Sequence, residues 1–532
     1  MESNRIESDI YKSYNAIVEH YLNNSITERD WLPSTFSTTS VEAIINEKKS
    51  YPSSHRNILV DSIKSQYLSC GIDTESDGKL NDQLNLLSQD NTYVVTTGHQ
   101  LCLFTGPLYF VIKVLQTAKL ADELRTKDSS INVVPIFWLA SEDHDFPEAN
   151  HVHLFGKSLM WQDEQGGGLG KYNTESLSDV LEEMMQIVGQ SDNAEVLKEI
   201  FTEAYGKRLN LSQATRILVH RLFGEKGIVV LDGDDPKLKA LFKDYMKDEI
   251  SENRMYQQVS ETNLLISPSF KIQVNPRKIN LFYLDNNSRS RIDTVETGFK
   301  TIDSNKLWSK EALLNEIDSY PEKFSPNVIL RPIYQEVILP NLCYIGGPGE
   351  LSYWLQLKSS FESWNIGFPG LNLRNSFLWL DQNTQKKLSK LSLSTSDLFK
   401  EVSEINKRIM NYEEHADDIE LEFKSVSSAF EKVSRIATDI DPSLKTYILA
   451  EQRKSEKLLE LIKKRVVKAK KDKNKVALET YKKINEKLFP NGSLHERYDN
   501  FIPYFLKHGW TFFDIIYDQI DPFDDRLCVI SE

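Results

Sequence analysis

The stretch Tyr93-Val-Val-Thr-Thr-Gly-His-Gln-Leu-Cys-Leu-Phe-Thr-Gly-Pro-Leu-Tyr-Phe110 decides the fold. Its apolar, β-branched run from Val94 to Thr97 predicts a buried strand. Pro107 suits the first turn of a helix, because its missing N–H would have no partner there. Apolar residues with a 3.6-residue period then predict a helix from about 108 to 125. A second apolar run, 133 to 140, predicts the next strand.

Strand, helix and strand in this order make a βαβ unit, which builds parallel sheets. Comparable patterns continue to about residue 385. Further apolar runs predict strands at 227–232, 270–274, 280–284, 327–331 and 341–345, and helical patterns at 175–224 and 351–364. This alternation predicts an α/β fold with a largely parallel sheet covered by helices.

Past residue 385 the hydrophobic period changes to that of a coiled coil. Apolar residues follow alternating steps of four and three at Leu398, Val402, Ile405, Ile409, Tyr412, Ala416, Ile419, Phe423, Val426, Phe430 and Val433. Asp441-Pro442 then precedes a second long helix that ends before Pro490. We predict an antiparallel coiled-coil hairpin. The predicted segments are an N-terminal helical region packed on the core at 1–90, the core at 91–385, the coiled-coil arm at 386–490 and a C-terminal segment returning to the core at 491–532.

Composition bounds the function. The 532 residues carry a net charge of −14, which argues against general nucleic-acid or membrane-surface binding. The basic run from Arg453 to Lys475 lies on the predicted coiled coil, where a solvated flank explains it. The sequence shows no signal peptide, no apolar run of membrane-spanning length and four scattered cysteines. We therefore expect a cytoplasmic protein.

Polar side chains follow both strands of the βαβ unit, where open α/β sheets bind ligands. His99 and Gln100 follow the first strand, and a histidine there can bind a phosphate or exchange a proton near neutral pH. Asp143 to Asp145 follow the second strand, and His151 and His153 lie further on. This cluster suits a substrate amine or hydroxyl group. A zinc site is the alternative, but the spacing matches no strong zinc signature, so we predict no metal.

Two other groups of residues could bind anions. Gly346-Gly-Pro-Gly-Glu350 stands where a strand turns into a helix, so a ligand could approach the backbone and its N–H groups. Arginines near predicted strand ends suit carboxylates or phosphates, and they are Arg277, Arg289, Arg291, Arg331 and Arg374. The glycine cluster at 166–170 is interpreted as a surface turn.

The run Thr97-Gly-His-Gln-Leu101 with Phe104-Thr-Gly-Pro-Leu-Tyr109 resembles the cysteine-adding enzyme family of bacillithiol biosynthesis, the cysteine ligases. Supporting motifs stand at 137–146, 280–284, 324–328, 330–336, 344–351, 373–377, 488–494 and 496–501. The resemblance implies a Rossmann-like core with connecting insertions and an arm that pairs two subunits as a homodimer. It also implies likeness to class I aminoacyl-tRNA synthetases, with 97–100 at the position of their His-x-Gly-His signature.

The implied reaction is the last step in the synthesis of this low-molecular-weight thiol. It forms an amide between the carboxyl group of cysteine and the amine of glucosaminyl-malate. A free carboxylate is a poor acyl donor and must first be activated, so ATP is a candidate cofactor whose requirement stays open.

The resemblance and the residues together suggest roles. We expect an anionic intermediate near Gly98, His99, Gln100 and 346–350. Asp143, His144 and Asp145 would bind the cysteine ammonium group or deprotonate the attacking amine. Arg277 and Arg374 would hold the malate carboxylates. The remaining expected substrate-binding residues are Thr97, Thr105, Gly106, Asn150, His153, Tyr344, Gly346, Gly347, Gly349, Glu350 and Asn375.

Two alternatives come from other classes of protein. One is a metal-dependent hydrolase that uses Asp143, His144, His151 and His153. The other is a non-catalytic dimeric scaffold centred on the coiled coil.

Overall fold

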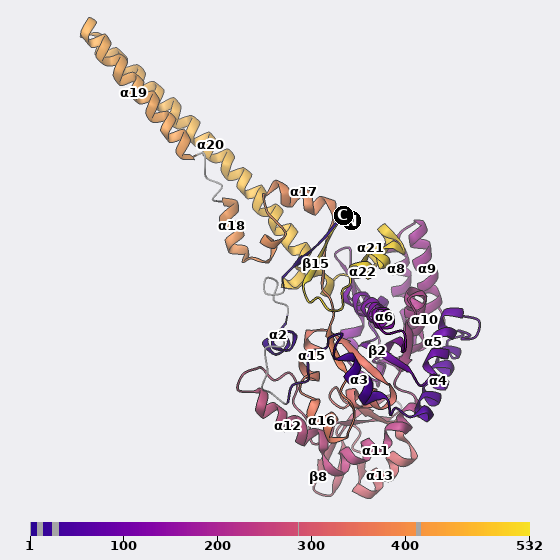
Figure 1. Cartoon of the computed structure of the whole chain (residues 1–532). Helices are drawn as coiled ribbons and strands as arrows, with labels where there is room; N and C mark the ends of the chain where they lie inside the picture. The colour runs from indigo at the N-terminus through magenta and orange to yellow at the C-terminus, as the bar shows by residue number, and fades with distance from the viewer. Residues whose placement is uncertain (1, 8–13, 24–30, 286, 411–415) are drawn as a thin grey trace. The chain divides into compact units, whose positions relative to one another are not determined.

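The computed structural model describes residues 2–7, 14–23, 31–285, 287–410 and 416–532 (Figure 1). The chain forms two compact units. The larger comprises Glu7–Phe377 and Glu496–Cys528, and the smaller comprises Met1–Ile6, Leu378–His495 and Val529–Glu532. The predicted division into four segments stays a prediction.

The larger unit is built on a five-stranded parallel sheet, here called the central sheet. Its order is β13 (Gly370–Leu373), β12 (Asn341–Gly346), β2 (Thr92–His99), β3 (Asn132–Leu139) and β6 (Val229–Asp232). Helix α6 (Tyr109–Lys127) connects β2 to β3 and packs against both strands. Val94 and Val133 are fully buried, as the apolar runs require. The predicted βαβ unit and the α/β fold with a parallel sheet are confirmed.

The larger unit also contains helices, which lie between the strands in the sequence. They are α2 (Ala16–Leu22), α3 (Val41–Lys48), α4 (Ser53–Leu68), α5 (Gly78–Leu87), α7 (Phe146–Ala149), α8 (Ser178–Val188), α9 (Asp192–Tyr205), α10 (Leu211–Phe223), α11 (Pro236–Glu252), α12 (Arg254–Ile266), α13 (Lys310–Ser319), α14 (Arg331–Ile338), α15 (Pro348–Trp354), α16 (Lys358–Ser363), α21 (Ile502–His508) and α22 (Thr511–Gln519). Helix α11 begins with Asp235 as N-cap and Pro236 as its first residue, the start that these two residue types favour.

A second, antiparallel sheet follows in the same unit. Its order is β10 (Leu307–Trp308), β9 (Gly298–Thr301), β8 (Ser288–Val295), β7 (Leu281–Asp285) and β11 (Phe324–Pro326). Of its strands only β7 was expected. A short hairpin, β4 (His151–Leu154) and β5 (Lys157–Met160), completes the strands of this unit.

Three predicted elements are wrong. Residues 327–331 form a turn, because the Asn327 side chain accepts the N–H groups of Ile329 and Leu330 and the chain then enters α14. Residues 270–274 form no strand, and the N–H of Val274 is donated to the Gln356 side chain. The helix expected at 351–364 is divided into α15 and α16. Between them the N–H groups of Gln356 and Leu357 bond carbonyl oxygens three residues back, which makes a turn in place of the regular α-helix.

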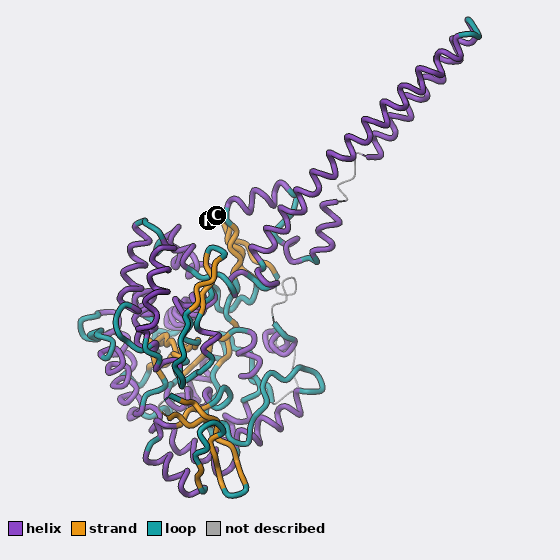
Figure 2. Tube along the Cα trace, turned by 180° about the vertical axis from the view of Figure 1, so that it is seen from behind, coloured by secondary structure: helices purple, strands orange, loops and turns teal. Residues whose placement is uncertain are grey.

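The smaller unit holds the predicted arm. It contains a sheet of order β1 (Glu2–Ile6), β15 (Leu527–Ser531) and β14 (Phe377–Leu380), and the helices α17 (Gln382–Lys390), α18 (Val402–Met410), α19 (Ala416–Ile440) and α20 (Leu444–Leu488). Helices α19 and α20 lie side by side as a long hairpin (Figure 2), so the antiparallel coiled coil is confirmed.

The first half of the predicted heptad seam is not one helix. Lys400 is extended, with φ −80° and ψ 160°, so Leu398 stands in a separate 3-10 turn before α18. Tyr412 lies outside the described residues. Across the described ranges, no helix is both long and apolar enough to cross a membrane.

Candidate functional site

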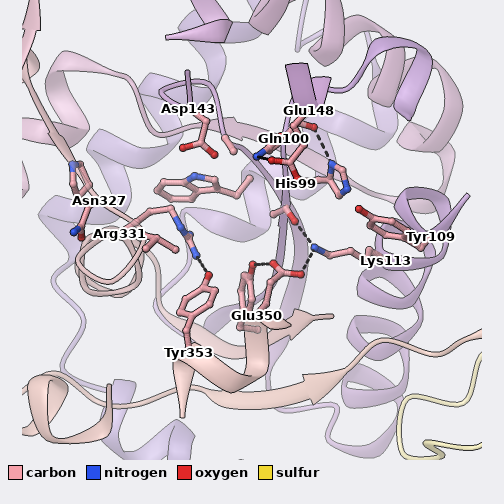
Figure 3. A pocket seen from close by; sticks show the side chains of 16 residues that line it. His99, Gln100, Tyr109, Lys113, Asp143, Glu148, Asn327, Arg331, Glu350 and Tyr353 are labelled. Atoms are coloured by element: carbon pink, nitrogen blue, oxygen red, sulfur yellow. Dashed lines mark hydrogen bonds and ion pairs between the residues drawn. The ribbon is translucent and has the colours of Figure 1, made fainter. Parts of the chain in front are cut away.

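A cavity of about 320 Å³ opens at the carboxyl ends of β2, β3 and β12 (Figure 3). We call it the central cavity. The polar and charged side chains that line it and carry the argument are His99, Gln100, Lys113, Asp143, Glu148 and Arg331. This is the edge of a parallel sheet at which open α/β folds bind ligands. The sequence-based position of the site and the position of the cavity therefore agree.

His99 is the last residue of β2 and stands at the cavity wall, partly exposed. Its Nδ1 lies 2.9 Å from the Gln100 carbonyl oxygen, so Nδ1 carries the hydrogen and donates it. The ring contacts those of Tyr109 and Phe110, with ring centroids 5.3 and 5.2 Å away. Burial, together with the positive charge of Lys113, lowers the pKa of His99 to about 4. The imidazole is therefore neutral near pH 7.

Gln100 and Glu148 form a second polar pair at the cavity. The Gln100 Nε2 donates to Glu148 Oε2 over 2.7 Å. Glu148 belongs to α7, the short helix after the Asp143 loop, and Gln100 follows β2. The contact thus ties the segment after β2 to α7, which follows β3, and Figure 3 shows Glu148 in the upper part of the view, beside Gln100.

A partly buried ion pair lies at the cavity, with Lys113 2% exposed and Glu350 30% exposed. Lys113, on α6, donates to the Gly98 carbonyl oxygen over 2.5 Å and to Glu350 Oε2 over 2.8 Å. Glu350 also accepts the Tyr344 hydroxyl over 2.5 Å and the Gly347 N–H over 2.8 Å. Burial alone would raise the pKa of Glu350, but the charge of Lys113 and these donors lower it. Glu350 is therefore ionised.

This pair changes the interpretation of the glycine-rich turn. The N–H of Gly347 is already bonded to Glu350, the acid of the same turn. Helix α15 spans only seven residues, so its start is a weak anion site. A Cβ at Gly346 would meet Leu351 at 2.9 Å, whereas Gly349 has open space around it. Gly346 is thus needed for packing, and the anion expected at 346–350 would have to do without the Gly347 N–H.

Arg331 lines the cavity and forms no ion pair with the residues that the structure describes. Its guanidinium lies 5.7 to 5.9 Å from the ring centroids of Trp138, Tyr344 and Trp354. Its hydrogen bonds go to neutral acceptors, Gln335 Oε1 at 2.9 Å and the Tyr353 hydroxyl at 3.5 Å. Within the described part of the chain, no carboxylate lies within 4.0 Å of it. An arginine held in this way is ready to bind an anionic group.

The acidic loop after β3 is held from the side by Arg289 of β8. Arg289 donates to His144 Nδ1 over 3.0 Å and lies 3.9 Å from Asp143. Burial and the charge of Arg289 lower the pKa of His144. Because Nδ1 accepts this bond, a neutral His144 carries its hydrogen on Nε2, and the lone pair of Nδ1 is occupied by the bond from Arg289. Asp143 lines the cavity, whereas His144 and Asp145 are exposed outside it.

The glycine segment at 166–170 positions the Asp143 loop. Leu169 and Gly170 donate their N–H groups to the carbonyl oxygens of Asp143 and Ser141, each over 2.7 Å. A Cβ at Gly170 would lie 2.5 Å from that of Ser141, and one at Gly166 would lie 2.4 Å from the Asn287 carbonyl oxygen. The segment is thus packed between two loops, and the close packing explains its glycines.

Several expected substrate-binding residues lie in the framework around the cavity. Thr97 donates to the Ile345 carbonyl oxygen and joins β2 to β12. Thr105 and Gly106 have positive φ values of 72° and 65°, and the buried Asn500 clamps this turn through the carbonyl oxygens of Phe104 and Gly106. A Cβ at Gly106 would lie 2.6 Å from that of Cys102.

The remaining expected residues are placed away from the cavity lining. Asn150 donates to the Trp161 carbonyl oxygen, and His153 stacks on Tyr498 with ring centroids 4.0 Å apart. Arg374 forms a buried ion pair with Glu496 at 2.8 Å. Asn375 donates to the Asp524 carbonyl oxygen, and Arg277 is exposed. Their roles in substrate binding stay predictions.

The metal-dependent hydrolase receives no support. His144 is bonded to Arg289, and His153 stacks on Tyr498. Among the residues that the structure describes, no three His, Cys, Asp or Glu side chains converge as metal ligands.

Sequence reasoning missed Lys113 and Glu148 and could not rank Arg331 above the other arginines. Lys113 lies inside an apolar helix pattern, where a lysine is usually a solvated residue. In the structure its side chain is only 2% exposed. The one sign of this in the sequence is that Lys113 stands among the apolar residues of the predicted helix.

Two family models match the chain. One, described as the N-terminal Rossmann-like domain of bacillithiol biosynthesis BshC, matches residues 1–375, and the C-terminal coiled-coil domain of BshC matches 377–532. Curated relatives bear the name "Putative cysteine ligase BshC". The chain is 38% identical over 521 residues to that of Flavobacterium johnsoniae, covering 97% of both. It is 39% identical over 477 residues to that of Flavobacterium psychrophilum, covering 90% and 89%. The relative from Bacillus mycoides is 27% identical over 466 residues, with 84% and 86% covered.

Proposed function

Since the chain belongs to the BshC family of bacillithiol biosynthesis, we propose that it is a ligase that joins the cysteine carboxyl group to the amine of glucosaminyl-malate. The product is an amide, and the step is the last in the formation of this low-molecular-weight thiol. The observation that carries the proposal is Arg331, a cation without an acidic partner in the cavity. Glucosaminyl-malate offers the carboxylates that such a guanidinium binds in a bidentate manner.

The carboxylates at the cavity suit the amino group that each substrate carries. Asp143 and Glu148 line the cavity and have only weak or neutral partners, Arg289 at 3.9 Å and the Gln100 amide. Carboxylates of this kind attract the ammonium groups of cysteine and of glucosaminyl-malate. A cavity with an open guanidinium and two open carboxylates favours substrates that carry both charges.

Carboxyl activation completes the proposal. Amide formation from a free carboxylate needs an acyl-adenylate or an acyl-phosphate, so we name ATP as the co-substrate to test. The cation available to a phosphate group is Arg331, since Lys113, which also lines the cavity, is already paired with Glu350. The Gly347 N–H is bonded to Glu350 and is not available.

The arm supports a further part of the proposal, a homodimer. Large apolar side chains are exposed on α19 and α20, namely Val433, Ile436, Ile440, Tyr447, Leu458 and Leu461. A two-helix hairpin cannot cover this surface alone, and a second copy of the arm would. Sedimentation of the full chain should give a dimer, and Leu458→Lys with Leu461→Lys should give a monomer. A wild-type monomer at micromolar concentration would contradict this assembly.

We also place the enzyme in the cytoplasm. Its four cysteines are free and buried, and a reducing compartment keeps such thiols free.

The deciding experiment is a product assay. Purified protein is incubated with glucosaminyl-malate and cysteine, with and without ATP and magnesium, and the thiol, AMP, ADP and phosphate are followed by mass spectrometry. Product with AMP indicates an adenylate, and product with ADP indicates an acyl-phosphate. Arg331→Met is the matched negative control. Absence of product under every condition, with folded protein, would overturn the proposal.

A further inference from the structure

The ring of His99 has one nitrogen fixed and one nitrogen open. Nδ1 donates to the Gln100 carbonyl oxygen at 2.9 Å and lies 3.8 Å from the Cys102 sulfur. Within the described residues, no side chain or backbone group bonds Nε2. Nε2 has no hydrogen-bond partner among these residues and is not fully buried, so a ligand in the cavity that the ring lines can reach it. Nε2 is therefore an accessible lone pair.

The surroundings keep this ring neutral. Lys113 bonds the carbonyl oxygen of Gly98, the residue before His99, and Arg374 adds a second positive charge nearby. Glu350 is the acid that faces the ring, and it is already shared among Lys113, Tyr344 and the Gly347 N–H. The rings of Tyr109 and Phe110 contact the imidazole at a tilt and edge-on, and burial is the main cause that lowers its pKa. Glu350 is thus held by other donors and does not bond the His99 ring.

From this geometry we propose that Nε2 of His99 is a fixed hydrogen-bond acceptor for the substrate amine, which positions the nucleophile without taking its proton. The inference rests on the proposed ligase function and assigns a subsite within it. An amine N–H donates to Nε2, and the nitrogen lone pair stays free for attack on the activated carboxyl carbon. The ammonium proton passes to water before the amine binds. When the C–N bond forms, the bond from the acyl carbon to the phosphate or AMP oxygen breaks. One amine proton stays on the amide nitrogen, and the other leaves with the released phosphate or AMP.

The same argument assigns the chemical class of the group bound at His99. A neutral ring beside Lys113 offers nothing to an anion, since Nε2 has no hydrogen to donate. Burial and the positive charge of Lys113, which lower the pKa of His99, also disfavour an ammonium ion at this point. A neutral primary amine satisfies both conditions. The anionic part of the same substrate then lies at Arg331.

The first test needs no substrate. Two-dimensional NMR of protein labelled with ¹⁵N-histidine, with the His99 signals assigned by difference from His99→Gln, reports which ring nitrogen is protonated. We expect the hydrogen on Nδ1 and no titration of this ring between pH 5 and 8. A hydrogen on Nε2, or a titration midpoint between 6 and 7, would overturn the inference.

The second test compares variants that move the acceptor. In His99→Gln the amide oxygen can occupy the place of Nε2, whereas in His99→Asn the shorter side chain cannot reach it. We expect kcat/KM within about 10-fold of wild type for His99→Gln and a loss of about 100-fold for His99→Asn and His99→Ala. The acid limb of the pH profile should be the same in wild type and His99→Gln, because it belongs to the substrate amine. Equal losses in all three variants, or an acid limb that disappears in His99→Gln, would overturn the inference.

Failure of the ligase function itself gives a different pattern. If folded wild-type protein forms no product, calorimetric titration with glucosaminyl-malate still reports on the subsite. Affinity at least about 10-fold weaker in His99→Asn than in wild type and His99→Gln supports an amine acceptor. Equal affinities in all three would overturn it.

Discussion

Two arginines of the larger unit, Arg374 and Arg331, differ in whether an acidic side chain neutralises them. The difference separates a structural residue from a residue of the candidate site. Arg374 is 3% exposed and pairs with Glu496, which is itself fully buried, at 2.8 Å. Arg331 stands among aromatic rings at the cavity, and its acceptors are an amide and a phenol. The first charge is neutralised within the fold, so its removal affects folding. The second is neutralised only when a ligand arrives, so its removal affects binding.

The largest expected effect tests the framework arginine. Arg374→Met leaves the carboxylate of Glu496 buried without its cation, so we expect a loss of about 3–5 kcal/mol in the free energy of unfolding. Urea unfolding measures it. Glu496→Gln added to Arg374→Met removes the uncompensated charge and keeps an acceptor for the Phe377 N–H, so it should restore part of the loss. A single variant as stable as wild type would show that Arg374 is not structural.

The next effect tests the open arginine. Arg331→Met should lower kcat/KM for glucosaminyl-malate by about 100-fold or more, because a desolvated guanidinium–carboxylate contact is lost. The free energy of unfolding should change by less than about 1 kcal/mol, since no ion pair is broken. Arg331→Lys keeps the charge but not the fork, and it should lie between wild type and Arg331→Met. Strong destabilisation with normal kinetics would reverse the assignment.

A third buried acid, Glu249, forms no ion pair with any residue that the structure describes. Glu249 accepts bonds from the Met255 N–H and from the backbone and side chain of Asn280, and burial raises its pKa from 4.5 to about 7. A raised pKa in the folded state means that stability present below pH 4.5 is lost as the pH rises towards 7. The loss should reach at most about 3 kcal/mol.

Glu249→Gln removes this titration at the cost of one hydrogen bond. At pH 4.5 the free energy of unfolding of the variant should be lower than that of wild type. Between pH 4.5 and 7 it should fall by less than that of wild type, and urea unfolding at several pH values measures this difference. An unchanged pH slope would mean that another group titrates there.

The smallest effect concerns the cavity acid. Asp143 is 42% exposed, so its attraction for a substrate ammonium group is screened. Asp143→Asn should raise KM by about fivefold at low salt and by less at high salt. Asp244→Asn, on the outer side of α11, is the matched control and should change neither. A loss of kcat at unchanged KM would give Asp143 a role in the chemical step instead.

Periodicity predicted the elements whose residues all lie in one stretch. The alternation of apolar run, glycine and helical pattern from 93 to 140 suffices for β2, α6 and β3, and the heptad pattern suffices for α19 and α20. The antiparallel sheet was missed because strands of two to eight residues carry little pattern of their own. The turn at Asn327 was missed because a side chain, and not the apolar period, terminates the strand.

The sequence by itself determined the α/β core, the coiled-coil hairpin and the edge of the sheet at which the cavity opens, because these follow from local patterns of burial. The sequence could not determine which charged side chains lack an oppositely charged partner. Arg374 meets Glu496 across 122 positions, and Lys113 meets Glu350 across 237. Whether a charge has a partner depends on which distant segments the fold brings together. Only the tertiary structure therefore distinguishes Arg331 and His99 at the cavity from the framework residues that resemble them in sequence.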